Sequence, residues 1–312
     1  MEQQLVTLFG GGGFLGRYVA QALLKAGARV RVAERDPSDA FFIRPLGGLG
    51  QTQFVGTDIT RADSAARAAE GSHAVVNLVG VLKGDFRRMH VEAARNAAAA
   101  AAAVGARAFV QVSAIGADPE SPSAYGRSKA DGERAVREAF AGATIVRPSV
   151  LFGPEDDFVN RFGRLIRLLP LVPVLAGETK LQPAWVADVA RAIAAAALDP
   201  AGHAGRTYHL GGPEVMTMAA LNRRIAALTG RNRSFLDLPD SVGAMLANGL
   251  GWLPGAPITA DQWAMLSRDN VVPAEAAGFE AFGIAPTPLA AVAPGWLVQY
   301  RREGRFSLGN PA

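Results

Sequence analysis

The sequence predicts an α/β protein: a Rossmann-type doubly wound parallel sheet, followed by a smaller C-terminal α/β lobe. Apolar strand-like segments alternate with helical ones through the first half of the chain, which is typical of βαβ units. The first apolar segment ends in a run of glycines, as in nucleotide-binding sheets. Ala74–Val79 and Ala108–Ser113 are nearly continuous apolar runs, as expected of strands that are covered on both faces.

The elements of the first half follow from this alternation. Glycines that end helical segments, such as Gly71 and Gly105, are suited to the left-handed conformation that often closes a helix. A loop is expected from Asp36 to Gln51. The predicted strands are Leu5–Phe9, Arg29–Ala33, Thr52–Val55, Ala74–Val79, Ala108–Ser113 and Thr144–Arg147, and the predicted helices are Phe14–Ala26, Arg61–Ala69, Ala93–Val104 and Ser128–Phe140.

The character of the chain changes after Pro148, where proline and glycine become frequent. Helices are predicted over Trp185–Leu198 and Thr217–Thr229, from apolar residues spaced three and four apart, and a short strand over Tyr208–Leu210. Asp156 and Asp157 are expected to cap a helix that begins near Phe158. We therefore predict an NAD(P)-binding core over residues 1–150. Residues 151–312 form a lobe that returns some elements to the core, covers its cleft and offers a partner surface.

The amino-acid composition excludes several classes of function. The 312 residues carry a net charge of +4, with 19% charged and 49% hydrophobic residues, so a large core can form and no nucleic-acid-binding run is evident. The chain has no cysteine, which excludes disulfides and a thiolate nucleophile, and its four histidines lack metal-ligand spacing. No signal peptide and no apolar run of about 18 residues is seen, so we expect a cytoplasmic protein.

The glycine run predicts a dinucleotide-binding turn. Gly10 allows the tight turn, Gly13 lets the backbone approach a pyrophosphate, and Gly16 lets helix and strand pack closely. The following helix N-terminus offers free N–H groups to phosphates. The alternative is a glycine-rich turn without a ligand.

The end of the second strand bears on the choice of nucleotide. Glu34 is suited to the ribose hydroxyls of NAD, whereas the neighbouring Arg35 is suited to the 2′-phosphate of NADP. The two interpretations compete, because a carboxylate repels a phosphate. We favour NADPH, with Arg35 on the 2′-phosphate and Glu34 turned outward or paired with Arg31. The alternative is that Arg35 is only a solvated loop charge.

A second chemical signal follows the fifth strand. Tyr125 and Lys129 are four residues apart, so both lie on one side of a helix. A cationic lysine favours the phenolate of a nearby tyrosine, which can then exchange a proton with a substrate. The lysine can also hold the nicotinamide ribose. The alternative is a packed aromatic side chain beside a surface charge.

These motifs, with N-L-V-G at Asn77–Gly80 and R-P-S-V-L-F-G at Arg147–Gly153, resemble the extended or atypical short-chain dehydrogenase/reductase superfamily. The resemblance implies Tyr125, Lys129 and Ser113 as catalytic or vestigial, nucleotide-holding residues. It also implies a set of cofactor-binding residues: Gly10, Gly12, Gly13, Phe14, Leu15, Gly16, Arg35, Asp58, Ile59, Asn77, Val79, Gly80, Ser113, Tyr125, Lys129 and Pro148.

The chain departs from the active members of this superfamily at one position. Those members usually carry a Ser-Ser or Ser-Thr pair after the fifth strand, and here Ser113 is followed by Ala114. A missing hydroxyl donor removes transition-state stabilisation. The departure puts turnover in doubt but leaves nucleotide binding intact.

A closer resemblance rests on Ile43–Gln51, Leu181–Ala190 and Ile258–Val272, which look like a bacterial form of the dehydrogenase-like accessory subunit of respiratory complex I (the alpha-subcomplex subunit nine family). It implies bound NADPH, no independent turnover, and peripheral-arm subunits of complex I as partners. It also implies a peripheral location on the cytoplasmic face of the inner membrane, with possible contact to the membrane surface. The candidate partner-surface residues are Leu250, Trp252, Leu253 and Trp263.

The alternative is an NAD(P)-dependent reductase, epimerase or dehydratase. Its substrate would be a sugar nucleotide or an apolar, quinone-like molecule. The C-terminal lobe holds few charges that would grip a sugar diphosphate.

Overall fold

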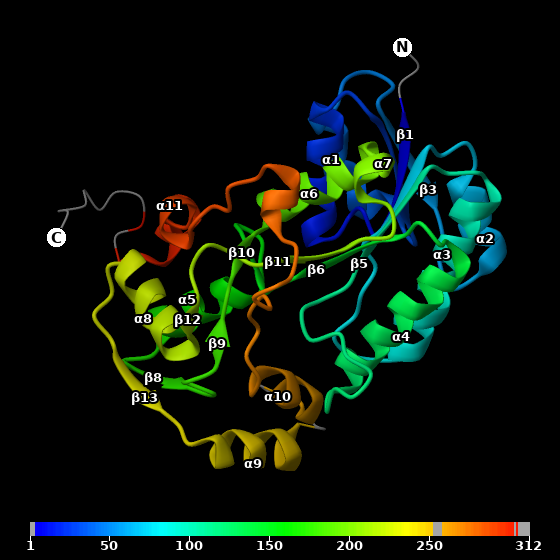
Figure 1. The fold of residues 1–312 in the computed structure, drawn as a ribbon. Coiled ribbons are helices and arrows are strands. Elements are labelled where there is room, and N and C mark those ends of the chain that lie inside the picture. The colour runs from blue at the N-terminus through cyan, green and yellow to red at the C-terminus, as the bar shows by residue number, and fades with distance from the viewer. Residues whose placement is uncertain (1–3, 252–257, 303, 305–312) are drawn as a thin grey trace. The chain divides into compact units, whose positions relative to one another are not determined.

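A computed structural model describes residues 4–251, 258–302 and 304. The chain divides into two compact units (Figure 1). The first unit consists of Met1–Pro148, Val186–Leu210 and Pro273–Ala285, and the second of Ser149–Trp185, Gly211–Val272 and Pro286–Ala312. Two segments from the second half of the chain thus belong to the first unit.

The first unit is built on a parallel sheet of seven strands, which confirms the predicted fold class. The strands lie in the order β11-β6-β5-β4-β1-β2-β3. All of the predicted strands of the first half are present, and the strand predicted near Tyr208 adds to the sheet beside β6, with Tyr208 opposite Val146. Their bounds are β1 Leu5–Phe9, β2 Arg29–Glu34, β3 Thr52–Gly56, β4 Ala74–Asn77, β5 Ala108–Val112, β6 Thr144–Pro148 and β11 Thr207–Leu210.

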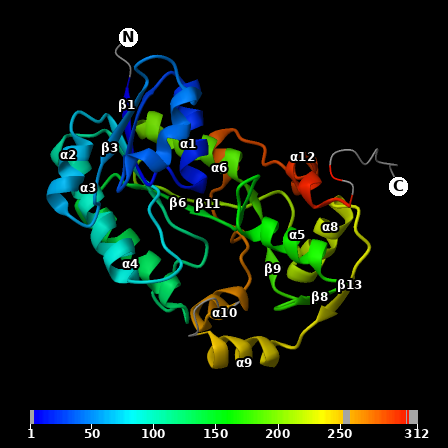
Figure 2. The same cartoon turned by 180° about the vertical axis from the view of Figure 1, so that it is seen from behind.

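Helices cover both faces of this sheet, as a doubly wound fold requires. Helices α1 (Phe14–Lys25) and α6 (Val186–Leu198) pack together on one face, with the short α7 (Pro200–His203) after α6. Helices α2 (Ala62–Ala69), α3 (Ala93–Ala103) and α4 (Ala124–Ala139) pack side by side on the other face; Figures 1 and 2 show the two layers from opposite sides.

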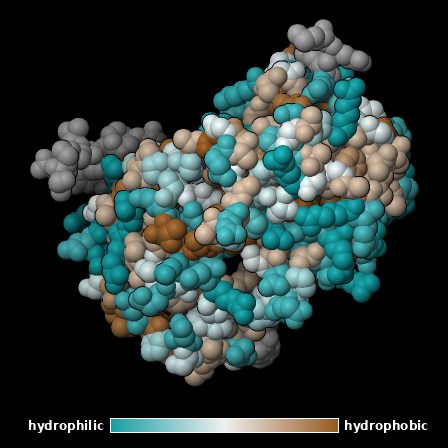
Figure 3. Space-filling model, in the orientation of Figure 1, coloured by the Kyte–Doolittle hydropathy of each residue, from teal (hydrophilic) through white to brown (hydrophobic). Residues whose placement is uncertain are grey.

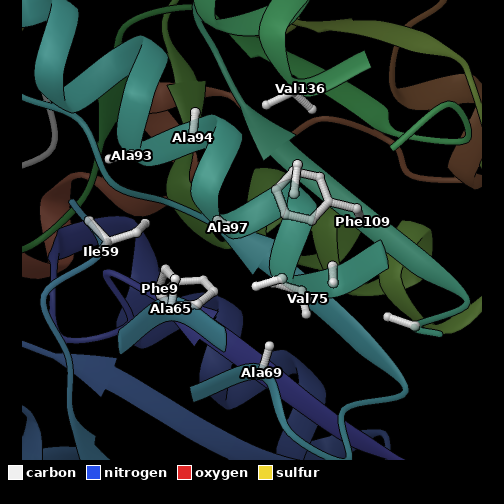
Figure 4. Close-up of a cluster of buried hydrophobic side chains, with 14 of the residues drawn as sticks. Phe9, Ile59, Ala65, Ala69, Val75, Ala93, Ala94, Ala97, Phe109 and Val136 are labelled. Carbon is white, nitrogen blue, oxygen red and sulfur yellow. The ribbon is translucent and has the colours of Figure 1, made fainter. Parts of the chain in front are cut away.

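Small side chains bring the second helical layer close to the sheet. Helix α3 buries six alanines, and Figure 4 labels three of them in the same core cluster as the strand residues Phe9, Val75 and Phe109, with Ala97 beside Phe109. Alanine loses no side-chain entropy on burial and is the strongest helix former. The alanine run predicted as a packed helix is therefore confirmed as part of the core.

A buried ion pair fixes α4 against β6. Arg147 donates to both carboxylate oxygens of Glu133, from Nε at 2.9 Å and from a terminal nitrogen at 2.7 Å. The Glu133 side chain is only 3% exposed. A second arginine, Arg137, lies 3.9 Å from the same carboxylate on the next turn of the helix. The bidentate geometry sets the position of the helix that carries Tyr125 and Lys129.

Local structure differs from the sequence prediction at two places. Helix α4 begins at Ala124 rather than Ser128, because the Ser123 hydroxyl accepts a hydrogen bond from the N–H of Gly126 and caps the helix earlier. The predicted loop after β2 contains a 3-10 helical segment, Pro37–Leu46, which buries Ala40 and Ile43. The prolines at positions 37 and 45 and the glycines that follow indicated a loop, and they concealed this short helical segment.

The second unit combines helices with three two-stranded sheets. Asp156 caps α5 by accepting hydrogen bonds from the N–H groups of Val159, at 2.5 Å, and Asn160, at 3.2 Å, as predicted for this carboxylate. The prediction for Asp157 is wrong, because this residue occupies the N-cap position but its side chain makes no capping hydrogen bond. The bounds are β7 Leu151–Phe152, α5 Phe158–Leu168, β8 Leu171–Val174, β9 Lys180–Leu181, β10 Ala184–Trp185, β12 Met216–Thr217, α8 Met218–Leu228, β13 Ser234–Asp237, α9 Asp240–Leu250, α10 Ala260–Leu266, α11 Leu289–Val292 and α12 Pro294–Leu297.

Aromatic side chains form part of the core of the second unit. Trp296 stacks on both Phe152 and Trp185, which are tilted relative to each other, and the three centroid distances are 5.5–6.3 Å. Among the described residues, no helix is long and apolar enough to span a bilayer.

We expect Glu133→Gln to lower the free energy of unfolding by about 3 kcal/mol, because it leaves the Arg147 guanidinium without its buried counter-charge. Asp131→Asn on the same helix is the matched control: Asp131 pairs with Arg134 at an exposed site, where such a pair contributes less than about 1 kcal/mol. Urea unfolding of both variants measures the difference. Equal losses would mean that the buried pair does not fix the helix.

Candidate nucleotide-binding site

The glycine turn has the geometry that a dinucleotide requires. Gly10 has a φ of +81°, and the N–H of Gly13 donates to the Gly10 carbonyl oxygen at 3.2 Å, which closes a tight turn. A Cβ atom on Gly16 would collide with the carbonyl oxygens of Gly10 and Gly11, so only glycine fits there. At Gly13 a Cβ would meet only the Gly10 carbonyl oxygen, at 3.4 Å, and this exposed backbone can approach a ligand.

The start of α1 is suited to a pyrophosphate. Gly13 is the N-cap residue and no side chain caps this helix end. The first N–H groups of the helix, on Phe14, Leu15 and Gly16, therefore have no intrahelical acceptor. Together with the positive end of the helix dipole they form an anion site. The residues present fit the diphosphate of an NAD(P) cofactor.

Glu34 turns into the glycine turn. Its Oε1 accepts a hydrogen bond from the N–H of Gly12 at 2.6 Å. The expectation that Glu34 points outward or pairs with Arg31 is wrong, because Arg31 donates instead to the carbonyl oxygens of Ala68 and Glu70, at 2.7 and 2.6 Å. Burial raises the pKa of Glu34, against the opposing effect of the Gly12 hydrogen bond. Arg35 is exposed beside it.

The ends of β3 and β4 supply the next predicted residues. Asp58 accepts hydrogen bonds from the N–H and the hydroxyl of Thr60, at 3.0 and 2.7 Å, and these bonds lower its pKa. Ile59 is buried in the core cluster that Figure 4 draws. Asn77 donates to Gln111 at 2.9 Å and accepts from the N–H of Val79 at 3.1 Å, which shapes the turn leading to the exposed Gly80.

Lys129 reaches from α4 to the end of β5. Its Nζ donates to the Val112 carbonyl oxygen at 2.8 Å, and burial lowers the pKa of Lys129 to about 8. Burial also raises the pKa of Tyr125 to about 12, which favours its protonated form at neutral pH. Pro148 ends β6, and its carbonyl oxygen accepts from the N–H of Ile115 at 3.0 Å.

Ser113 offers an unused polar atom at this place. Its side chain is buried, and its hydroxyl has no hydrogen-bond partner among the described residues. A buried hydroxyl without a partner is costly in the free protein. A bound ligand with a polar group would satisfy it, which supports a ligand site at the end of β5. Ala114, the next residue, supplies no second hydroxyl.

His90 is a further residue of the site that was not predicted from the sequence. This buried residue lies on a π-helical segment, Arg87–Glu92, directly before α3. Its Nε2 accepts from the N–H of Val81 at 3.0 Å, and its Nδ1 lies 2.8 Å from the Ser128 hydroxyl, which donates to the Tyr125 carbonyl oxygen at 2.7 Å. His90 thus links the turn after β4 to the first turns of α4.

The hydrogen bonds of His90 determine its protonation state. Because Nε2 accepts from a backbone N–H and the Ser128 hydroxyl donates to a carbonyl, Nδ1 must carry the proton and the ring is neutral. Burial, followed by the positive charge of Lys129, lowers the pKa of His90 to about 3. Nothing in the sequence pattern distinguished this histidine from the other three.

The predicted residues lie along one edge of the sheet in the first unit. Each group follows the carboxyl end of a different parallel strand, from β1 to β6, and this is where open α/β sheets bind ligands. The fold and the edge together define a nicotinamide-nucleotide-binding protein of the Rossmann type.

The comparison with known proteins gives the family. The pattern of the NAD dependent epimerase/dehydratase family matches residues 6–211, and the chain belongs to this family. Over 293 residues the chain is 36% identical to NADH dehydrogenase (ubiquinone) 1 alpha subcomplex subunit 9, mitochondrial, of Mus musculus, covering 91% of this chain and 77% of the relative.

Two further similarities are to named enzymes. The chain is 36% identical over 196 residues to a ceramide reductase of Caulobacter vibrioides, covering 61% of this chain and 60% of that protein. It shares the fold of an NADPH-dependent quinone oxidoreductase of Escherichia coli, solved with NADPH, with a TM-score of 0.75 and 21% identity over 94% of this chain and 99% of that one.

Replacement of His90 tests its link to the turn after β4. The longer amide side chain of the His90→Gln variant can still accept from the Val81 N–H, whereas the shorter one of His90→Asn can only reach Ser128. We expect His90→Asn to bind NADPH roughly fivefold more weakly than His90→Gln, the effect of about one net hydrogen bond. If calorimetric titration gives the two variants equal affinities for NADPH, the hydrogen bond from Val81 to His90 does not contribute to nucleotide binding.

The same residue predicts a pH dependence of stability. The unfolded imidazole takes up a proton below a pH of about 6.5, whereas the native ring does so only near a pKa of about 3. The unfolded state therefore binds more protons, and the free energy of unfolding falls as the pH drops through this interval. His90→Gln should flatten this part of the stability profile in urea titrations at several pH values.

Proposed function

We propose that the chain is a non-catalytic, NADPH-binding accessory or assembly subunit of respiratory NADH:ubiquinone oxidoreductase, complex I. The observation that carries the proposal is the similarity to the mouse alpha subcomplex subunit 9, which extends over 91% of this chain and so includes both units. A likeness confined to the nucleotide-binding half would support only a shared fold.

The side chains at the end of β5 are better suited to binding a nucleotide than to catalysing a reaction with it. A tyrosine whose pKa is about 12 is a poor proton-exchange group at neutral pH. Lys129 donates its hydrogen bond to the Val112 carbonyl oxygen, and Ala114 cannot polarise a substrate oxygen. Ser113, Tyr125 and Lys129 would then contact the nicotinamide end of the cofactor, which supplies a hydride when an enzyme uses it.

NADPH is proposed over NADH because of Arg35. This exposed guanidinium follows β2, next to the residue that contacts the glycine turn, and can form paired hydrogen bonds to a 2′-phosphate. The Glu34 carboxylate opposes the phosphate. Its Oε1 is held by the Gly12 N–H at 2.6 Å, so this oxygen faces the turn.

The proposed location is peripheral, on the cytoplasmic face of a bacterial inner membrane, against peripheral-arm subunits. Of the residues expected to form the partner surface, Trp252 and Leu253 lie outside the described residues, as does the Leu250 side chain. Trp263 is half-buried and its ring packs on Gly243 of α9, so this indole covers the unit's own helix.

A second candidate function is that of an NAD(P)-dependent reductase, epimerase or dehydratase. The retained Tyr125 and Lys129 and the similarity to a ceramide reductase favour a reductase, with an apolar substrate, within this class. In that case binding of cofactor and substrate would have to lower the pKa of Tyr125.

Two substitutions test the choice of nucleotide. Arg35→Ala should weaken NADPH binding by about 1.5–3 kcal/mol, the contribution of a charged hydrogen bond, and leave NADH binding unchanged. Glu34→Gln should strengthen NADPH binding, because it removes a carboxylate from beside the phosphate. Titration calorimetry with both nucleotides measures these changes. Equal affinities of the unchanged protein for NADPH and NADH would refute the role of Arg35.

A further pair tests the accessory role. We expect Lys129→Ala to lower the NADPH content of purified complex I and the amount of assembled complex. Tyr125→Phe should leave both, and NADH oxidation by membranes, nearly unchanged. Native gel electrophoresis and nucleotide extraction give the two readouts. NADPH oxidation with a carbonyl substrate that Tyr125→Phe abolishes would support the reductase instead, and a purified complex without this chain would refute the proposed partner.

A further inference from the structure

Arginines gather at one corner of the second unit, where α5 ends. Arg164 and Arg167 lie on α5, Arg231 and Arg233 precede β13, and Arg302 comes two residues after Tyr300. Tyr300 and α5 bring them together: Arg167 lies over the Tyr300 ring at 5.9 Å, Arg231 donates to the Tyr300 carbonyl oxygen, and Arg233 donates to the Arg167 carbonyl oxygen at 3.5 Å. Burial, followed by the positive charges of Arg233, Arg167 and Arg302, lowers the pKa of Arg231. The charges that act on this guanidinium are thus of its own sign. We name these five residues the arginine corner.

Two of the five have structural roles that explain their presence. Arg233 donates from Nε to the Ile166 carbonyl oxygen at 2.8 Å, in the last turn of α5, and a cation there also suits the helix dipole. Arg231 donates from Nε to the Tyr300 carbonyl oxygen at 2.5 Å. Arg164, Arg167 and Arg302 are exposed, and one helix end does not account for three more cations.

Exposed apolar side chains adjoin the arginine corner. Leu168, which is 69% exposed, follows Arg167, and Leu171, which is 49% exposed, lies opposite Ser234 in the β8–β13 pair. Pro173 and Leu236 form the next pair on the same outer face, with Leu236 47% exposed. Figure 3 shows hydrophobic side chains at the surface over β8 and β13, next to hydrophilic ones. We name Leu168, Leu171 and Leu236 the leucine patch.

This combination points to a lipid surface. Clustered like charges raise the energy of the free protein, and an anionic partner relieves it. A soluble anion would account for the arginines but gains nothing from the leucines. An anionic bilayer offers both phosphate groups for the guanidinium groups and an acyl boundary for exposed leucines. A basic cluster or an apolar patch alone gives only marginal membrane binding, whereas the two together give a stable contact.

We propose that the arginine corner and the leucine patch form a docking surface for the anionic phospholipid headgroups of a membrane. This inference deepens the peripheral membrane location proposed above and rests on it, but it does not depend on the accessory role in complex I. It assigns membrane contact to the end of α5 and to the outer face of the β8–β13 sheet.

Vesicle co-sedimentation of the full-length protein tests the docking surface. We expect binding to vesicles that contain phosphatidylglycerol, little binding to pure phosphatidylcholine, and a fall in binding with added salt. The combined substitution Arg164→Gln, Arg167→Gln and Arg302→Gln should weaken binding about fivefold for each arginine removed. These three side chains are chosen because they are exposed, so folding is expected to be retained.

Matched controls separate the surface from net charge and general hydrophobicity. The substitutions Arg29→Gln, Arg95→Gln and Arg107→Gln remove the same charge from exposed sites in the first unit and should leave binding nearly unchanged. Leu168→Ser with Leu171→Ser should weaken binding, whereas Leu49→Ser, at an exposed leucine of the first unit, should not.

Several results would overturn the proposal. They are a lack of binding of the unchanged protein to anionic vesicles, equal losses in the arginine variant and its control, and an arginine variant that binds as well as the unchanged protein. An acidic protein as the true partner would give the first result. Because the assay contains neither complex I nor nucleotide, these outcomes are independent of the accessory role.

Discussion

The site depends on the close approach of α1 to the end of β1. This approach is possible only because Gly16 has no side chain to collide with the carbonyl oxygens of Gly10 and Gly11. The turn aims the first N–H groups of α1 along the edge of the sheet where the other strands end. Glu34 then accepts from the Gly12 N–H, which ties β2 to the same turn.

Much of this arrangement could be predicted from the sequence, because it follows from local patterns. The strand-turn-helix at Gly10–Gly16, the i, i+4 spacing of Tyr125 and Lys129 and the cap at Asp156 each involve residues close in the chain. The orientation of Glu34 could not be predicted. The Glu34 carboxylate could accept a hydrogen bond either from the glycine turn, 22 residues earlier in the chain, or from the nearby Arg31. The sequence contains both donors and does not show which one is used.

The role of His90 shows the same limit more strongly. Its partners, Val81 and Ser128, lie 9 and 38 residues away, on a turn and a helix that only the folded sheet brings together. A buried histidine with two satisfied nitrogens acts as a rigid neutral linker, so its value to the site is geometric. Pattern reasoning identifies residues by the chemistry they can perform, and therefore overlooks those that only hold others in place.

The place of β11 in the sheet has a consequence for how the protein is made. This strand covers the outer edge of β6 and comes from residues 207–210, beyond the start of the second unit. Until that segment leaves the ribosome, β6 presents unpaired backbone groups, which invite pairing with another chain. A fragment that stops near residue 150 would keep this open edge permanently. The nascent chain must therefore produce the first segment of the second unit, Ser149–Trp185, before this edge of the sheet can be covered, and the window for aggregation at the edge ends only when the strand order is complete.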